Sequence, residues 1–91
     1  VIRFTDPEDA VAQANASPYG LAAGIWSKDI KKAHAVARRI KAGTVWINTY
    51  NQYDAAAPFG GYKRSGFGRE LGSDAIRLFT ETKTVWVDLN Q

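Results

Sequence analysis

The strongest constraint on the fold is the alternation of strand-like and helix-like patterns over residues 1–49. Residues 1–4 read VIRF, residues 21–26 read LAAGIW and residues 44–49 read TVWINT. Aliphatic and aromatic runs of this kind favour strands, and a continuous apolar run is typical of a strand covered on both faces. The order β-α-β-α-β with short connections predicts an α/β fold, with parallel strands joined by right-handed crossovers and helices covering the sheet.

Start and stop signals place two helices within this alternation. Asp6 is expected to cap a helix that begins at Pro7 and runs to about Ala14, because proline suits the first helical position. Ser27 is expected to cap a second helix, whose apolar side chains recur at three- and four-residue intervals. Gly43 is expected to end that helix in the left-handed conformation.

The last third of the chain predicts one more helix and one strand. Residues 70–79 are expected to form the helix, although Gly72 and Ser73 weaken its start, so that Ser73 is an alternative boundary. Residues 82–89 alternate apolar and polar side chains, as strands do. No tight hairpin turn precedes them, so we expect this strand to pair with a sheet of another subunit or domain.

Composition excludes several classes of function. The chain of 91 residues is expected to form one globular unit, and its lack of cysteine excludes a disulfide, a thiolate zinc site and a cysteine nucleophile within it. It has no apolar run of membrane-spanning length and no signal peptide, which predicts a cytoplasmic protein without a membrane partner. The net charge of +3 is spread rather than clustered, so nucleic-acid binding is not expected. His34 has no neighbouring partner and is expected to be solvated.

The architecture itself indicates where a site would lie. In open parallel α/β sheets, ligands bind beyond the carboxyl ends of the strands. The third predicted strand leads into residues 48–61, which read NTYNQYDAAAPFGG. This loop offers aromatic side chains and amides but neither a nucleophile nor a histidine base. It is therefore predicted to form a wall of a pocket.

Residues 58–72 read PFGGYKRSGFGRELG and hold five of the eight glycines. This segment is neither a P-loop, since Phe67 follows Gly66, nor a dinucleotide fingerprint, since Leu71 stands where a third glycine would be needed. We expect its glycines to let the backbone turn tightly and pass close to other segments.

Four stretches together carry a family resemblance: SPYGLAAGIW, AGTVWINTYN, APFGGYKRSGFGRELG and TETKTVWV. In order and spacing they resemble the C-terminal end of the NAD(P)-dependent aldehyde dehydrogenase superfamily. The resemblance implies that residues 1–80 are an incomplete part of the catalytic domain and that residues 81–91 form an oligomerisation strand. It also implies that the catalytic cysteine, the base and the cofactor domain lie upstream, in a chain of which this is a fragment.

The implied reaction is oxidation of an aldehyde to a carboxylate with NAD or NADP. The fragment alone is expected to be inactive and to hold no cofactor, and its partners are expected to be the rest of the dehydrogenase chain and further copies of the subunit. The alternative is a free-standing small binding or assembly module derived from the same fold.

The resemblance also implies three substrate-pocket residues, Asn51, Tyr53 and Phe59, which match the loop that lines the family's aldehyde funnel. The alternative for Phe59 is a core aromatic beneath the glycine turn. Asn48 and Tyr50 can equally tie the loop to its neighbours or touch substrate. Because residues 51–59 contain no Arg or Lys, neutral or cationic aldehydes are expected to fit better than semialdehydes of diacids.

In the betaine-aldehyde branch of the family, the carbonyl oxygens at the positions that match Lys63 and Gly66 help to hold a monovalent cation. The resemblance therefore implies a candidate potassium site at these two residues, since carbonyl ligands suit such a cation. The glutamate that matches Glu70 takes part in a proton relay in that branch. The alternative, which the residues themselves favour, is that Lys63, Arg69 and Glu70 form structural ion pairs that fix the loop.

Overall fold

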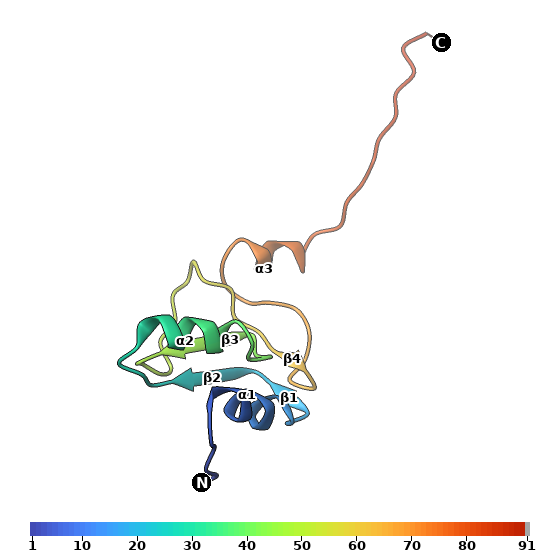
Figure 1. Cartoon of the computed structure of the whole chain (residues 1–91). Coiled ribbons are helices and arrows are strands. Elements are labelled where there is room, and N and C mark those ends of the chain that lie inside the picture. Colours follow the sequence, from blue (N-terminus) through green and yellow to red (C-terminus); the bar gives the residue numbers. More distant parts are fainter. Residues whose placement is uncertain (91) are drawn as a thin grey trace.

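The computed structural model describes residues 1–90 and contains two small sheets and three helices (Figure 1). No helix in this part of the chain is both long and apolar enough to cross a membrane. The elements in chain order are α1 (Pro7–Asn15), β1 (Tyr19–Gly20), β2 (Ala22–Ile25), α2 (Ile30–Ala37), β3 (Thr44–Ile47), β4 (Tyr62–Lys63) and α3 (Asp74–Arg77).

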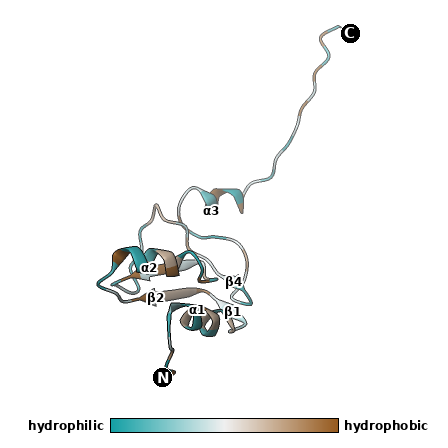
Figure 2. Cartoon of the chain, in the orientation of Figure 1, coloured by the Kyte–Doolittle hydropathy of each residue, from teal (hydrophilic) through white to brown (hydrophobic). Residues whose placement is uncertain are grey.

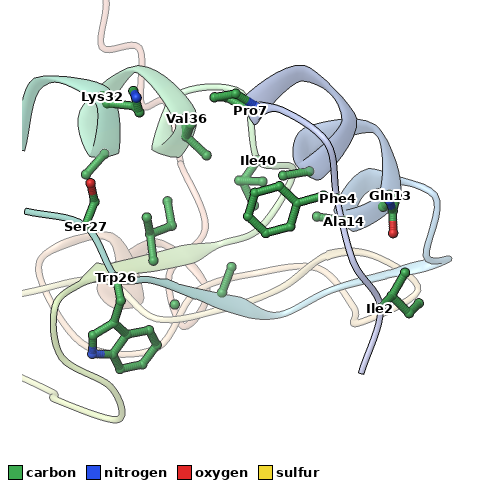
Figure 3. Close-up of a pocket in the computed structure, with 15 residues that line it drawn as sticks. Ile2, Phe4, Pro7, Gln13, Ala14, Trp26, Ser27, Lys32, Val36 and Ile40 are labelled. Atoms are coloured by element: carbon green, nitrogen blue, oxygen red, sulfur yellow. The ribbon is translucent and has the colours of Figure 1, made fainter. Parts of the chain in front are cut away.

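The central unit is β2-α2-β3, in which the two strands are parallel as predicted. Their register joins Ala22 to Thr44 and Ile25 to Ile47. Figure 3 shows α1 and α2 on the same side of β2, with Trp26 on the other side. Helix α2 carries hydrophobic and hydrophilic residues side by side, as an amphipathic covering helix does (Figure 2).

The first predicted strand is absent from the described residues, so the complete β-α-β-α-β unit does not form. Residues 1–4 pair with no strand, and Ile2 and Phe4 are 79% and 61% exposed. A strand exists only through a hydrogen-bonded neighbour, and neither sheet of this chain offers one to these residues. They lie instead along the groove beside α1, β2 and α2 (Figure 3).

Helix α1 starts as predicted, because the Asp6 carboxylate accepts a hydrogen bond of 2.8 Å from the Asp9 N–H. The predicted cap of α2 is wrong. Asp29 caps it by accepting from the Lys32 N–H at 2.9 Å, while the Ser27 hydroxyl accepts from the Asp29 N–H at 3.1 Å. Ser27 therefore shapes the turn that leads into the helix, and the carboxylate two residues later completes the cap.

Gly43 does not cap α2, which corrects a second prediction. The helix ends at Ala37, its C-cap Arg38 is right-handed, and Gly43 is not among the residues with positive φ. A Cβ on Gly43 would lie 1.6 Å from the Gly60 carbonyl oxygen. This glycine is required by the close approach of two backbones.

The glycine-rich segment folds back on the body of the chain in a way the sequence did not indicate. β4 pairs antiparallel with β1, joining Tyr19 to Lys63, and Phe59 and Glu70 form an antiparallel bridge. The partners are more than forty residues apart in the first pair, so no local hairpin signal exists for it.

Beyond this segment the chain contains one short helix and no strand within the described residues. The predicted helix over residues 70–79 is only the short α3, with Ser73 at its cap, which confirms the later of the two predicted boundaries. Residues 82–89 form no strand within the described chain and extend away from the body (Figure 1). Among residues 1–90, the buried hydrophobic residues are only Val11, Ala33 and Trp46.

Candidate functional site

The candidate site begins where β3 ends, at Asn48. Its N–H donates to the Ile25 carbonyl at 2.8 Å. Its side-chain oxygen accepts from the Ser27 N–H at 2.9 Å, and its side-chain nitrogen donates to the Ser27 carbonyl at 3.0 Å. Asn48 has a φ of 56°, in the left-handed region that asparagine tolerates. Of the two roles open to Asn48, its side chain performs the structural one and ties the loop to the end of β2.

Four aromatic side chains form a row along the loop, which we call the aromatic row: Tyr50, Trp46, Tyr53 and Phe59. The ring centres of Trp46 and Tyr50 lie 4.8 Å apart, those of Trp46 and Tyr53 5.8 Å, and those of Tyr53 and Phe59 5.1 Å. All three pairs meet edge to face, the arrangement that aromatic quadrupoles favour. Trp46 is buried and Phe59 half-buried, whereas Tyr50 and Tyr53 are more than half exposed.

The three predicted pocket residues come together here, with Tyr53 and Phe59 in the row and Asn51 at its edge. The Tyr53 hydroxyl donates to the Asn51 side-chain oxygen at 2.7 Å, and the Tyr53 ring meets Phe59. Asn51 also has a left-handed backbone, with a φ of 60°. The result is a surface with two aromatic faces and one neutral amide at its edge. Their contact with a substrate stays a prediction.

The segment after Phe59 is held by backbone pairing and tight turns. Phe59 and Glu70 exchange two N–H···O hydrogen bonds of 2.7 Å. Gly66 has a φ of 108°, which side chains rarely adopt, and Gly60 passes close enough to Gly68 that a Cβ would lie 2.3 Å from its carbonyl oxygen. Both observations agree with the turning and close approach expected of these glycines.

Lys63 anchors this segment to the end of α1. Its amine donates to the carbonyl oxygens of Asn15 and Ser17, at 3.0 and 2.7 Å. Its backbone is left-handed, with a φ of 52°. A charged donor makes stronger hydrogen bonds than a neutral one, so Lys63 fixes the position of β4.

Arg69 also binds carbonyl oxygens, those of Gly61 at 3.0 Å and Gly68 at 2.7 Å, and its guanidinium carbon lies 5.5 Å from the centre of the Tyr62 ring. Within the described residues, the ion pairs expected of Lys63, Arg69 and Glu70 therefore do not form. In the part of the chain that is described, none of Lys63, Arg64 and Arg69 pairs with a carboxylate, and Glu70 is exposed. Lys63 and Arg69 donate instead to backbone carbonyl oxygens, which the tight turns of this segment bring within reach.

The ion pair that does form lies away from this loop, between Arg39 and Glu8. Hydrogen bonds from the Arg39 guanidinium lower the pKa of Glu8 below its ordinary value. Hydrogen bonds from the Gln13 amide and the Thr5 N–H likewise lower the pKa of Asp9. These groups join the start of α1 to the chain around it and have no contact with the aromatic row.

Sequence reasoning missed one residue of this site, Trp46. Its indole N–H donates to the Gln52 carbonyl at 2.9 Å, and its ring supports both tyrosines of the row. The available signal was chemical: an indole in a buried strand needs an acceptor for its N–H, and a polar loop follows directly.

Comparison with known proteins identifies the family. The model of the aldehyde dehydrogenase family matches residues 1–85. The NADP/NAD-dependent aldehyde dehydrogenase PuuC of Escherichia coli (strain K12) is 51% identical over 98% of this chain and 18% of its own length. Betaine aldehyde dehydrogenase 2 of Rhizobium meliloti (strain 1021) is 52% identical, also over 98% of this chain and 18% of its own length.

Solved structures give the same result. The NAD+ complex of aldehyde dehydrogenase from Bacillus cereus matches with a TM-score of 0.88 and 59% identity, over 96% of this chain and 18% of that one. A point mutant of betaine aldehyde dehydrogenase from Staphylococcus aureus, in complex with NAD+, matches with a TM-score of 0.90 and 46% identity, over 97% and 18%. The chain thus spans less than a fifth of the relatives it matches, and over nearly all of its own length it belongs to the aldehyde dehydrogenase family.

Proposed function

We propose that this chain is a C-terminal segment of an NAD(P)-dependent aldehyde dehydrogenase and that its aromatic row forms one wall of the aldehyde pocket. The observation that carries the proposal is the meeting of Asn51, Tyr53 and Phe59 beyond the carboxyl end of β3. That edge of a parallel sheet is where α/β proteins bind ligands. The family match supplies the reaction class, oxidation of an aldehyde to a carboxylate.

The reacting groups would come from residues outside this chain, which contains no cysteine to act as the nucleophile. The nicotinamide cofactor, when bound, accepts the hydride. We assign no residue of this chain to it, because the glycine-rich segment fits a phosphate poorly: the Lys63 amine is already engaged by two carbonyl oxygens. The isolated chain should therefore form no NADH from acetaldehyde, and turnover by protein free of host dehydrogenases would contradict this.

The loop residues would bind and orient the aldehyde. The exposed halves of Tyr50 and Tyr53 offer aromatic faces, and residues 51–59 carry no Lys or Arg that would hold a second carboxylate. An aromatic face stabilises a quaternary ammonium group by about 0.5–2 kcal/mol, or about 2- to 30-fold in affinity. We therefore propose neutral or cationic aldehydes as substrates.

The turn between Lys63 and Gly66 is proposed as part of a site for a monovalent cation such as potassium. The Gly66 N–H donates to the Lys63 carbonyl at 3.3 Å, so the two proposed carbonyl ligands belong to one turn. The Lys63 ammonium is directed to α1, which removes a competing positive charge. Hard cations take several oxygen ligands, so other segments would complete the site.

Glu70 is proposed for the proton relay of the parent enzyme. Its backbone is fixed by the bridge to Phe59, while its side chain is exposed on this chain. It is thus held next to the aromatic row with its carboxylate available to residues of the rest of the enzyme. Relay function needs a partner within hydrogen-bond reach, which the rest of the enzyme would supply.

Residues 82–89 are proposed to add a strand to a sheet of another subunit. Val85, Val87 and Leu89 alternate with other residues, so they would share one face of a strand, and they are 74%, 73% and 89% exposed. Exposed apolar strands of this kind associate with other sheets.

The groove of about 450 Å³ beside Ile2 and Phe4 is likewise apolar enough to be covered by the rest of the dehydrogenase chain.

The test uses the full-length enzyme that contains this segment. kcat/KM is measured for betaine aldehyde, a medium-chain aliphatic aldehyde and succinate semialdehyde, in the native enzyme and in Tyr53→Ala. Tyr19→Ala is the matched control, since Tyr19 is also exposed but lies in β1, outside the aromatic row. We expect succinate semialdehyde to be the poorest substrate and Tyr53→Ala alone to change the relative values. Succinate semialdehyde as best substrate, or three unchanged values in Tyr53→Ala, would refute the assignment.

A further inference from the structure

Trp46 stands behind the proposed pocket wall, on β3 itself. It is 8% exposed and is one of only three buried hydrophobic residues in the described chain. From this position its ring meets the edges of Tyr50 and Tyr53, the two most exposed members of the aromatic row. A buried residue on a strand thus contacts both exposed candidates for substrate contact in the loop.

Trp46 also contacts the loop backbone, through a hydrogen bond. The Trp46 indole N–H donates to the Gln52 carbonyl at 2.9 Å, and Gln52 lies between Asn51 and Tyr53. The bond is partly buried and joins the strand to the loop. It fixes the peptide unit immediately before Tyr53, in a loop that has two left-handed asparagines and no regular backbone pairing of its own.

The strand opposite supplies a second constraint. Gly24 of β2 is the register partner of Trp46. A Cβ on Gly24 would lie 3.0 Å from a Tyr50 ring carbon and 2.8 Å from a Trp26 ring carbon, so the absence of a side chain makes room for both rings. Tyr50 therefore packs against Trp46 and occupies the space that a side chain at Gly24 would fill.

We propose that Trp46 is a positioning residue that sets the places of Tyr50 and Tyr53, and through them the selectivity of the pocket for bulky aldehydes. This inference rests on the proposed function, because it acts through the aromatic row. In this role Trp46 would act without touching substrate, because its ring is buried against the two tyrosines. Its effect should appear in KM for aldehydes large enough to meet the wall and hardly at all in kcat.

The test compares Trp46→Phe with the native full-length enzyme, using benzaldehyde as the bulky substrate and acetaldehyde as the small one. Phenylalanine keeps an aromatic ring but removes the N–H donor. Loss of one partly buried hydrogen bond corresponds to about a 2- to 10-fold change in an equilibrium constant. We expect KM for benzaldehyde to rise by about that factor, while KM for acetaldehyde and both kcat values change less than about twofold.

A merely structural role predicts a different result, a fall in kcat for both aldehydes as the folded fraction declines, with KM unchanged. That result, or unchanged KM values, would overturn the proposal. If Trp46→Phe does not fold, Gly24→Ala decides the matter, since its Cβ would lie 3.0 Å from the Tyr50 ring and should displace that ring from Trp46. We expect this variant to raise KM for benzaldehyde selectively, and an unchanged KM would overturn the proposal. Tyr53→Ala distinguishes failure of this inference from failure of the proposed function. If Tyr53→Ala shifts KM for benzaldehyde and Trp46→Phe does not, only the role of Trp46 is wrong. If neither variant shifts KM, the assignment of the aromatic row to the pocket is wrong as well.

Discussion

Gly43→Ala should be among the most damaging single-methyl changes in this chain. The added Cβ would lie 1.6 Å from the Gly60 carbonyl oxygen and 2.7 Å from its carbonyl carbon, whereas ordinary contact begins at 3.4 Å. Both backbones would have to separate by more than an ångström, because neither contacting atom belongs to a side chain that can rotate away. Overpacking typically costs about 1–3 kcal/mol, and this case belongs at or above the upper end of that range.

The same displacement should reach the proposed pocket. Gly60 follows Phe59 directly, so moving it disturbs the bridge to Glu70 and the packing of Phe59 on Tyr53. In the full-length enzyme we expect Gly43→Ala to lower both the denaturant midpoint of unfolding and kcat/KM.

Gly66→Ala is the comparison for stability. A Cβ there meets nothing within 4 Å, so its cost comes only from a φ of 108° and should be about 1–2 kcal/mol. Denaturant unfolding of both variants decides between sterics and strain. If Gly43→Ala destabilises the enzyme no more than Gly66→Ala does, the two backbones separate easily and the steric reasoning is wrong.

Three further predictions concern contacts away from the aromatic row. Lys63→Met removes the donor to two carbonyl oxygens at and just after the end of α1. It should lower the free energy of unfolding by about 1–2 kcal/mol, a modest loss because the exposed ammonium is also hydrated. An unchanged midpoint of denaturant unfolding would refute the role of Lys63 as an anchor. The pKa of Glu8 is lowered in the folded state, so its ionised carboxylate stabilises that state at pH values above its ordinary pKa of 4.5, and the stabilisation is lost as pH falls through the lowered pKa. Glu8→Gln should therefore flatten the acid side of the stability–pH curve. An identical curve would contradict the pairing with Arg39. Val85→Pro removes a ladder donor and should shift the sedimenting mass toward monomer or aggregate, and an unchanged mass would place the strand outside the interface.

Local signals predicted local structure well. The Asp6 cap, the proline that follows it and the apolar runs at residues 21–26 and 44–49 each act within a few residues, and the structure contains α1, β2 and β3 at these places. The cap of α2 was harder, because Ser27 and Asp29 both accept backbone hydrogen bonds and only the geometry shows which of them closes the first turn.

Features that depend on distant partners were not predictable in the same way. Residues 1–4 have strand composition but no neighbour to pair with, and β1 and β4 have a neighbour that no local pattern announces. Gly43 was predicted to be a helix cap because it follows a helical pattern. Its actual role depends on Gly60, which is seventeen positions later in the sequence and which no local pattern indicates.

The pocket loop was predicted from two sources that agree. The ends of parallel strands indicate where ligands bind, and the resemblance to aldehyde dehydrogenases selected Asn51, Tyr53 and Phe59 within the loop. Neither source could indicate that Tyr53 bonds to Asn51 or that Trp46 supports the row from below. Those contacts depend on side-chain directions that only the folded loop defines.

The most direct test of the central claim is a crystal structure of the full-length enzyme with a bound aldehyde analogue or carboxylate product. The account predicts that carbon atoms of the ligand lie within about 4 Å of the rings of Tyr53 and Phe59, the distance of ordinary apolar contact. A ligand bound elsewhere in the enzyme, with the Tyr53 ring facing solvent or packed against protein alone, would contradict it.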